Sequence, residues 1–138
     1  MLSVCLLSAC TAAPSVPAPL ADSPACRAAL AAAPASVLDR GRVGVDGPAT
    51  LAWGQPPVVV RCGLAEPAPT STSCLTVDGV DWVVDTSADP VTAVSYGRSP
   101  AVEVLVPASL GTDVVPAALV DLGPIARTLP RTAHACVG

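Results

Sequence analysis

The sequence predicts an α+β domain: a small antiparallel sheet with hairpins, flanked by an N-terminal helix and short C-terminal helical turns, with two disulfides. Three observations lead to this prediction. A capped, alanine-rich segment begins at Ser23, the residues from Thr50 onward follow a period of two, and the last apolar residues return to loosely helical spacing. A helix first, strands in the middle and a helix last is an order typical of α+β domains.

Composition limits the size of the core and the kinds of partner. The 138 residues have room for one domain. Hydrophobic residues make up 51% of the chain, but aromatic residues only 2%, so most of the core must be built from small side chains. The net charge is −4, and the seven basic residues are scattered arginines. Without a basic stripe, nucleic acid is not expected as a partner. The chain as given also contains no apolar run of about 18 residues, as a transmembrane helix needs.

The first helix is expected directly after Ser23. This serine suits the N-cap position, and Pro24 suits the first helical position because a proline there loses no hydrogen bond. The alanine-rich run that follows should end at Pro34. Residues 35–48 hold three glycines and mixed charges, and we expect a loop there with at most a weak edge strand.

Alternation of side chains then indicates strands. A strand should end at Cys62, with Val58 and Val60 on the same face and with Val59 and Arg61 on the other. This places Cys62 toward the core.

A hairpin is expected around Asp78-Gly79, between strands 75–77 and 80–84. Asp-Gly between β-formers favours a type I′ turn, because both central residues need a positive φ. Trp82 should then face the core with its alternate neighbours.

Two further elements complete the predicted domain. Residues 91–96 and 101–106 read as a second hairpin joined by residues 97–100. Residues 116–128 carry apolar side chains at loosely helical spacing, interrupted by Gly123-Pro124. Because proline disrupts a helix interior, two short helical turns are expected rather than one continuous helix.

The start of the chain suggests a lipid anchor. Leu7-Ser8-Ala9-Cys10 resembles the lipobox of bacterial lipoproteins, in which small residues beside the cleavage site precede a cysteine that receives a diacylglyceryl group. Two or more acyl chains give durable anchoring, which one chain does not. The alternative is that Cys10 is an ordinary cysteine. Residues 1–9 contain no Lys or Arg, which a signal peptide needs at its start, so we expect the true start codon upstream.

This interpretation divides the chain into three parts. Residues 1–9 are expected to be the remnant of a signal peptide, residues 10–25 the lipidated cysteine with a Pro/Ala-rich tether, and residues 26–138 the single α+β domain. At about 3.1 Å per residue, a proline-rich tether of that length could hold the domain roughly 40 Å from its anchor.

The remaining cysteines predict two disulfides. With Cys5 removed and Cys10 lipidated, four remain for an oxidising compartment: Cys26, Cys62, Cys74 and Cys136. Four cysteines allow three connectivities, among which the sequence does not choose. The favoured pairing is Cys62–Cys74, across a short loop, with Cys26–Cys136 joining the ends of the domain. Close pairs such as C-x-x-C are missing and the chain has one histidine, so no metal site is expected.

Two motifs carry a resemblance to a known family. Residues 53–63 read W-G-x-P-P-V-x-x-R-C-G, and residues 96–104 read Y-G-R-x-P-A-V-E-V, with Val-Asp-Trp at 80–82 between them. Together they resemble a family of small actinobacterial envelope proteins classed as a domain of unknown function, over about residues 25–136. The resemblance implies a secreted, lipid-anchored or singly membrane-spanning protein whose domain faces outward. It brings no catalytic residues.

No catalytic residue or cofactor is expected. His134 would need a neighbour that the sequence does not indicate, and the chain has no G-x-S-x-G stretch, P-loop or dinucleotide fingerprint. The carboxylates of the distinctive segments are interpreted as turn formers or solvated strand positions, namely Asp78, Asp81, Asp85 and Glu103.

One group of residues is a candidate binding surface, because it combines all the aromatic residues with nearby charges. An arginine could hold an anion there, with aromatic rings lining the wall. The favoured alternative is that Arg61 and Glu103 form a cross-strand ion pair and that the tryptophans fill the core. The candidate residues are Arg61, Arg98, Glu103, Trp53, Trp82 and Tyr96.

Two functions remain from different classes. The favoured one is a cell-envelope lipoprotein on the outer face of the cytoplasmic membrane, a non-enzymatic module that binds an envelope protein or a wall component. The alternative is a hydrolase or transferase acting on wall polymers, for which carboxylates would have to converge and one would need a raised pKa.

Overall fold

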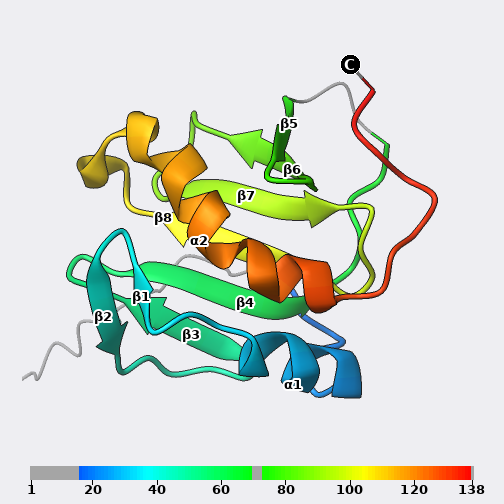
Figure 1. Cartoon of the computed structure of the whole chain (residues 1–138), viewed down its shortest axis with the longest axis horizontal. Helices are drawn as coiled ribbons and strands as arrows, with labels where there is room; N and C mark the ends of the chain where they lie inside the picture. Colours follow the sequence, from blue (N-terminus) through cyan, green and yellow to red (C-terminus); the bar gives the residue numbers. More distant parts are fainter. Residues whose placement is uncertain (1–15, 70–72, 138) are drawn as a thin grey trace, which may run out of the picture.

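The computed structural model describes residues 16–69 and 73–137. Along these residues the chain forms two α-helices and eight strands in one antiparallel sheet, which confirms the predicted α+β class (Figure 1). In chain order the elements are α1 (Pro24–Ala31), β1 (Ser36–Val37), β2 (Arg40–Val43), β3 (Thr50–Trp53), β4 (Val58–Leu64), β5 (Cys74–Val77), β6 (Val80–Asp85), β7 (Val91–Tyr96), β8 (Ala101–Val106), the 3₁₀ turns η1 (Ala108–Leu110) and η2 (Thr112–Val114), and α2 (Val115–Thr128).

The order of strands in the sheet differs from their order in the chain. Strands β1 to β4 follow one another, but β5 lies at the far edge, giving the order β1-β2-β3-β4-β8-β7-β6-β5. The chain therefore leaves β4, crosses the width of three strands, and returns one strand at a time until β8 pairs with β4. As a result, β4 and β5 are consecutive in sequence and far apart in the sheet.

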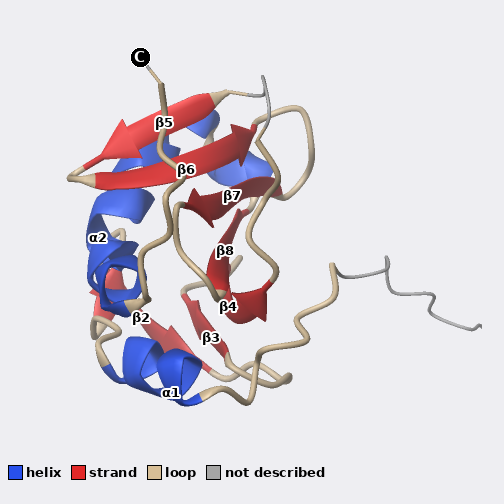
Figure 2. Cartoon of the chain, turned by 90° about the vertical axis from the view of Figure 1, so that its right-hand side faces the viewer, coloured by secondary structure: helices blue, strands red, loops and turns tan. Residues whose placement is uncertain are grey.

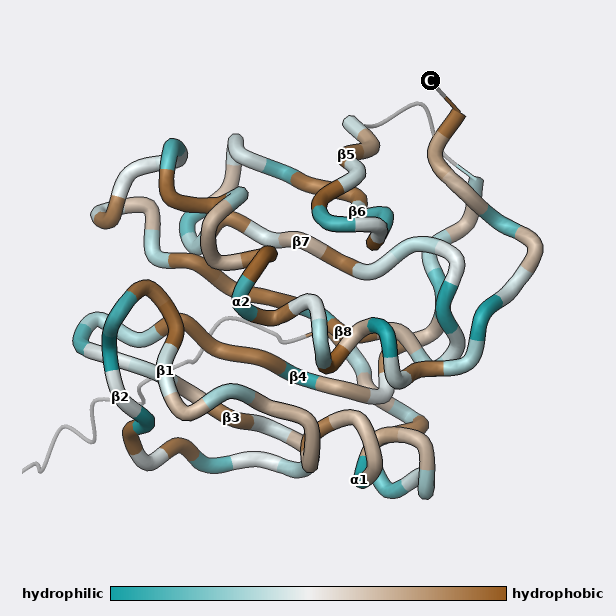
Figure 3. The backbone as a smooth tube through the Cα atoms, in the orientation of Figure 1, coloured by the Kyte–Doolittle hydropathy of each residue, from teal (hydrophilic) through white to brown (hydrophobic). Residues whose placement is uncertain are grey.

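Both helices cover the same face of the sheet (Figure 2). Helix α2 packs over β8, β6 and β5, while α1 lies beside α2 and against β4. The core between these layers contains the inward residues of the strands, including Val58, Val60 and Val104, and the buried side of α2. Strand β4, in the middle of the sheet, is hydrophobic along most of its length (Figure 3). We call the opposite side of the sheet the outer face.

The N-terminal helix forms as the sequence predicts. The Ser23 side chain accepts a hydrogen bond of 3.2 Å from the Cys26 backbone N–H, and Pro24 occupies the first turn. The helix ends at Ala31, three residues before Pro34. The segment 35–48, expected to be a loop with at most a weak edge strand, contains the two short strands β1 and β2 at the edge of the sheet.

Both predicted hairpins are confirmed. In the β5–β6 turn, Asp78 and Gly79 have φ values of 47° and 78°, as a type I′ turn requires, and Val77 pairs with Val80. The β7–β8 hairpin has the predicted strand bounds, and β7 pairs with β8 from Val91 opposite Val106 onward.

Helix α2 corrects the prediction of two short helical turns. It is one helix of 14 residues with Pro124 inside it. A proline removes only one helical hydrogen bond, the one its own N–H would donate. The helix continues because Leu119, Leu122 and Ile125 on both sides of the proline are buried against the sheet. Burial of this apolar side outweighs the local cost.

Part of the segment expected to be tether lies on the domain. Leu20 donates a backbone hydrogen bond of 2.9 Å to the Gly63 carbonyl at the end of β4. The Val16 carbonyl accepts one of 2.7 Å from the Arg61 Nη2. Gly63 suits this contact, because its φ is 109° and a Cβ there would overlap the backbone of Ala21. Residues 16–25 are therefore associated with the domain rather than extended away from it.

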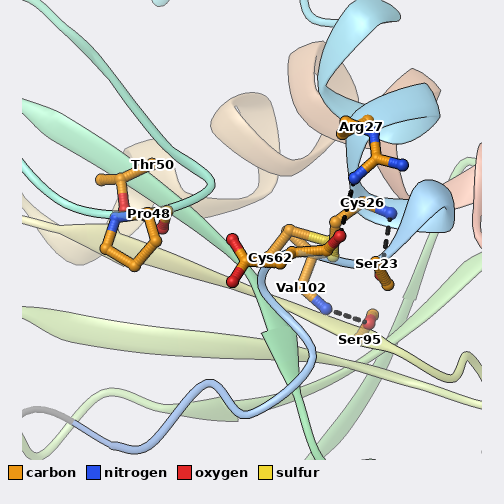
Figure 4. Close-up of a disulfide and its surroundings, with 9 residues drawn as sticks. Ser23, Cys26, Arg27, Pro48, Thr50, Cys62, Ser95 and Val102 are labelled. Atoms are coloured by element: carbon orange, nitrogen blue, oxygen red, sulfur yellow. Dashed lines mark hydrogen bonds between the residues drawn. A yellow bond between two sulfur atoms is a disulfide. The ribbon is translucent and has the colours of Figure 1, made fainter.

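The structure contains two disulfides, as predicted, but the favoured pairing is wrong. Cys26 pairs with Cys62, and Cys74 pairs with Cys136. Cys62 faces the helices in the middle of the sheet and meets the first turn of α1, where the Ser23 cap also lies (Figure 4). The prediction assumed that Cys62 and Cys74 lie on adjacent strands.

The sheet order excludes that assumption, because three strands separate β4 from β5. Cys74 also lies on the other side of the sheet. It pairs with Val83, which alternates with the core residues Trp82 and Val84 and so points to the outer face.

Candidate functional site

The two tryptophans of the candidate binding surface lie in the core. Trp53 and Trp82 are both 0% exposed and belong to the cluster between the sheet and the helices. The Trp53 Nε1 donates a hydrogen bond of 3.1 Å to the Pro34 carbonyl, which satisfies its polar atom. These residues fill a core that has few other large side chains, in agreement with the alternative interpretation.

Arg61 and Glu103 form the cross-strand ion pair that the alternative interpretation describes. They face each other on β4 and β8, and the Arg61 Nη1 lies 2.9 Å from the Glu103 Oε1. Glu103 is 3% exposed, so its expected solvated position is wrong. Arg61 pairs with it on the outer face and also donates a hydrogen bond to the Val16 carbonyl. A buried carboxylate requires such a partner, because an unpaired buried charge is strongly destabilising.

Arg98 has a structural partner in α2 rather than an open site for an anion. Its Nη1 donates hydrogen bonds of 2.8 Å to the Leu129 carbonyl and 3.2 Å to the Arg127 carbonyl. These carbonyls lie at the C-terminus of the helix, where the helix dipole favours a positive charge. Burial, followed by the charges of Arg131 and Arg127, lowers the pKa of Arg98 from its usual value, and Asp81 partly opposes this. The side chain is thereby used as a cap for α2.

Tyr96 is the member of the group that lies beside a titratable cluster. Its ring stacks on the His134 ring, with centroids 5.5 Å apart and an interplanar angle of 4°. His134 belongs to residues 130–137, which we call the C-terminal strap. The strap runs from the end of α2 toward the edge of the sheet that carries β5 (Figure 1).

Glu66 supplies the neighbour of His134 that the sequence did not indicate. The His134 Nδ1 lies 2.8 Å from the Glu66 Oε1, and the Thr132 hydroxyl donates a hydrogen bond to the same oxygen. Glu66 lies in the connection between β4 and β5. It is 68 residues from His134 along the chain, and only the crossing of that connection brings the two together. No local pattern in the sequence could have revealed the pair.

The pKa of Glu66 reflects this environment. Burial acts to raise it, but the hydrogen bonds from Thr132 and His134, the charge of His134 and a backbone hydrogen bond from Gly97 together lower the pKa below its ordinary value. The lowered pKa favours the ionised form of the Glu66 carboxyl. Because a carboxylate can only accept a hydrogen bond, the Nδ1 of His134 carries the hydrogen. The Nε2 is the ring nitrogen left for other contacts, on a side chain that is 42% exposed.

Gly97 allows the strap to lie this close. Its φ is 83°, and a Cβ at this position would overlap the carbonyl oxygen of His134. The Gly97 carbonyl also accepts a hydrogen bond of 2.9 Å from the Thr132 N–H. Further along, the Cys136 N–H donates a hydrogen bond of 2.8 Å to the Asp81 Oδ2. The strap is thus fixed at successive points across β7, β6 and β5.

The Glu66–His134 pair resembles one part of many catalytic and metal-binding sites, namely a histidine whose ring is oriented by a carboxylate. A carboxylate that holds the Nδ1 of a histidine is a common support for general bases and for metal ligands. Among residues 16–69 and 73–137, however, no group of three metal-ligating side chains is found. Three carboxylates of this region also do not converge: Glu66 is held by His134, Glu103 by Arg61, and Asp81 by the strap.

Comparison with known families assigns the chain to a group of related proteins. The sequence model described as "Protein of unknown function (DUF3515)" matches residues 8–133, which is most of the chain. The chain belongs to this family. Comparisons with curated proteins and with solved structures give no match.

The DUF3515 match covers the whole sheet and both helices, and it includes Glu66, Tyr96 and Thr132. It ends one residue before His134. The predicted lipidation site, Cys10, is also within the matched range but outside the described residues. In the part of this DUF3515 chain that the structure describes, no helix has the length and hydrophobicity to cross a membrane.

Proposed function

We propose that the chain is a cell-envelope lipoprotein, anchored through Cys10 to the outer face of the cytoplasmic membrane. Its domain acts as a non-enzymatic module that binds an envelope protein or a wall component. The likeness of residues 7–10 to a lipobox supports the anchor. The attribution to an actinobacterial source is part of the same proposal and depends on the two motifs at residues 53–63 and 96–104.

The observation that carries the proposal is the pair of disulfides. Disulfides form and persist in oxidising compartments and are rare in the cytosol of mesophiles. Here they use four of the six cysteines, Cys26–Cys62 and Cys74–Cys136. Two such disulfides support export of the domain, and the lipobox-like cysteine, Cys10, lies on its N-terminal side.

The position of residues 16–25 adds a geometric consequence. Because Val16 already contacts the domain, only residues 11–15 separate Cys10 from it. The chain advances by six residues from Cys10 to Val16, which reach at most about 22 Å when fully extended. The proposed anchor therefore holds the domain close to the membrane surface rather than roughly 40 Å away, as the tether of residues 10–25 suggested.

The wall-polymer hydrolase is the second candidate, and the Glu66–His134 pair favours it. His134 could act as a general base, with Glu66 orienting its ring. The lowered pKa of Glu66 and the separate partners of Glu103 and Asp81 argue against the paired carboxylates that such an enzyme commonly uses. The binding module is therefore the better supported function.

Lipidation of Cys10 tests the anchor. The gene is expressed in its own host, and the membrane fraction is extracted with a detergent that separates into two phases. We expect the wild type and Cys5→Ser in the detergent phase, because Cys5 lies within the expected signal segment. Cys10→Ser should lose the lipid and remain unprocessed or become soluble. An unmodified Cys10 in the mature wild type would contradict the anchor.

A sedimentation assay separates the binding module from the hydrolase. The domain is incubated with purified wall polymer, and both the bound protein and the soluble fragments are measured. Co-sedimentation without fragment release supports the binding module. Fragment release that is lost in His134→Ala would establish the hydrolase instead. Absence of both would restrict the proposed partner to an envelope protein, which crosslinking in the native membrane would then have to capture.

A further inference from the structure

The two disulfides have different environments. Cys26 and Cys62 are both 0% exposed and belong to the hydrophobic core. Cys74 is exposed, and Cys136 is half-buried. An external thiolate must reach a sulfur atom along the S–S axis to exchange with it. Only Cys74–Cys136 offers such access while the domain stays folded.

The accessible disulfide lies where its opening would leave the fold intact. Cys74 begins β5, the strand at the far edge of the sheet, and Cys136 lies near the end of the C-terminal strap. Strand β5 keeps its pairing with β6 and its contacts with α2 without the disulfide. Cys26–Cys62, by contrast, joins α1 to the centre of the sheet.

We propose that Cys74–Cys136 is a thiol–disulfide exchange site for an external dithiol. The thiolate of the dithiol attacks the Sγ of Cys74, forming a mixed disulfide, and Cys136 leaves as a thiolate that takes up a proton. The second thiol of the dithiol then attacks the first sulfur of the same dithiol, which is bonded to Cys74 in the mixed disulfide. Cys74 is released as a thiolate and takes up a proton. Two electrons pass to the protein, which gains two thiols, and the donor becomes a disulfide.

Reduction of Cys74–Cys136 changes the contacts of the C-terminal strap on the outer face of the sheet. In the oxidised protein the disulfide fixes the end of the strap, and the His134 ring covers one side of the Tyr96 ring. After reduction, the strap from His134 onward is held by the Glu66 contact and by single hydrogen bonds such as that from the Cys136 N–H to Asp81. Interactions of this kind near the surface contribute little individually. Reduction therefore loosens the end of the strap beyond His134, where the contact of the Cys136 N–H with Asp81 lies.

The test uses the full oxidised chain and dithiothreitol as the dithiol probe. The protein is exposed to graded concentrations under native conditions, trapped with iodoacetamide at intervals and mapped by mass spectrometry. We expect Cys74 and Cys136 to be modified at least tenfold faster than Cys26 and Cys62. Equal rates, faster loss of Cys26–Cys62, or no modification short of denaturing conditions would each overturn the proposal.

Hydrogen exchange shows whether the opening is local. In protein reduced only at Cys74–Cys136, protection should fall in residues 130–137 and remain in α1, β4 and β8. Loss of protection throughout would show that reduction unfolds the domain and would overturn the proposal. The Cys74→Ser/Cys136→Ser variant is a second test. Its sheet should stay protected from exchange, and its strap should lose protection as in the reduced protein. The Cys26→Ser/Cys62→Ser variant should instead lose protection in the core.

The site of attack is identified with a dithiol protein whose resolving cysteine is replaced by serine. The trapped mixed disulfide should be on Cys74, the more exposed of the two residues, and capture on Cys26 or Cys62 would contradict the proposal. This inference does not depend on the lipid anchor. Selective reduction can fail while Cys10 is lipidated, and it can succeed while Cys10 carries no lipid.

Discussion

Glu66 joins two parts of the chain that are distant in sequence. Its carboxylate receives hydrogen bonds from Thr132 and His134. These bonds attach the segment between β4 and β5 to the C-terminal strap. The sequence shows a glutamate among prolines and alanines, with nothing to mark it. A position in the sequence that forms only long-range contacts carries no periodicity, turn preference or spacing that could identify it.

The lowered pKa of Glu66 gives a pH dependence of stability. The ionised carboxylate stabilises the folded state above its ordinary pKa of 4.5, and this contribution is lost as the pH falls through the lower folded value. Glu66→Gln should therefore reduce the free energy of unfolding by about 1 kcal/mol at pH 7. The difference from wild type should disappear below the folded pKa of Glu66.

Urea unfolding measured between pH 7 and pH 3 checks this prediction, with Asp46→Asn as the control, since Asp46 lies on an exposed loop. A difference between Glu66→Gln and wild type that stays constant over this range would show that the charge of Glu66 does not stabilise the strap.

At the scale of elements, local signals predicted local structure well. The Asp78-Gly79 turn, the Ser23 cap and the alternation in β4 depend on neighbours a few residues away, and all three are confirmed. Helix α2 was predicted incorrectly, because the preference of Pro124 is local while the burial that overrides it depends on the sheet. Local signals also could not show that β4 and β5 lie far apart, because their separation depends on the order of the strands in the sheet.

A matched pair of glycines tests how the β7–β8 turn receives the strap. Gly97 and Gly79 have φ values of 83° and 78°, so an alanine at either should cost about 1–2 kcal/mol in backbone strain. At Gly79 a Cβ meets nothing within 4 Å, whereas at Gly97 it overlaps the His134 carbonyl. Gly97→Ala should therefore be the more destabilising by at least about 1 kcal/mol, a typical cost of overpacking.

Urea midpoints of the two variants, with hydrogen exchange of residues 130–137, measure this difference. Protection of the strap should fall in Gly97→Ala alone. Equal losses of stability in both variants, with the strap unaffected, would mean that it does not pack on Gly97 in solution.

For the whole molecule, covalent and electrostatic contacts at long range hold together a core made mostly of small side chains. One disulfide joins α1 to β4, and the other joins the strap to β5, with sequence separations of 36 and 62 residues. In the chain-entropy model each contributes about 4 kcal/mol. The number of disulfides followed from counting cysteines, but their pairing required the order of the strands. The proposed export and the proposed anchor are consistent with the two disulfides at this scale.

The measurement that tests the central claim most directly is non-reducing peptide mapping of mature protein isolated from the membranes of its own host. An exported, oxidised and anchored domain predicts Cys26 linked to Cys62, Cys74 linked to Cys136, and an N-terminal peptide that begins at a lipidated Cys10. Linkage of Cys26 to Cys136 or of Cys62 to Cys74 would contradict the fold described above. Four free thiols together with an unmodified Cys10 would contradict the assignment of the protein to the cell envelope.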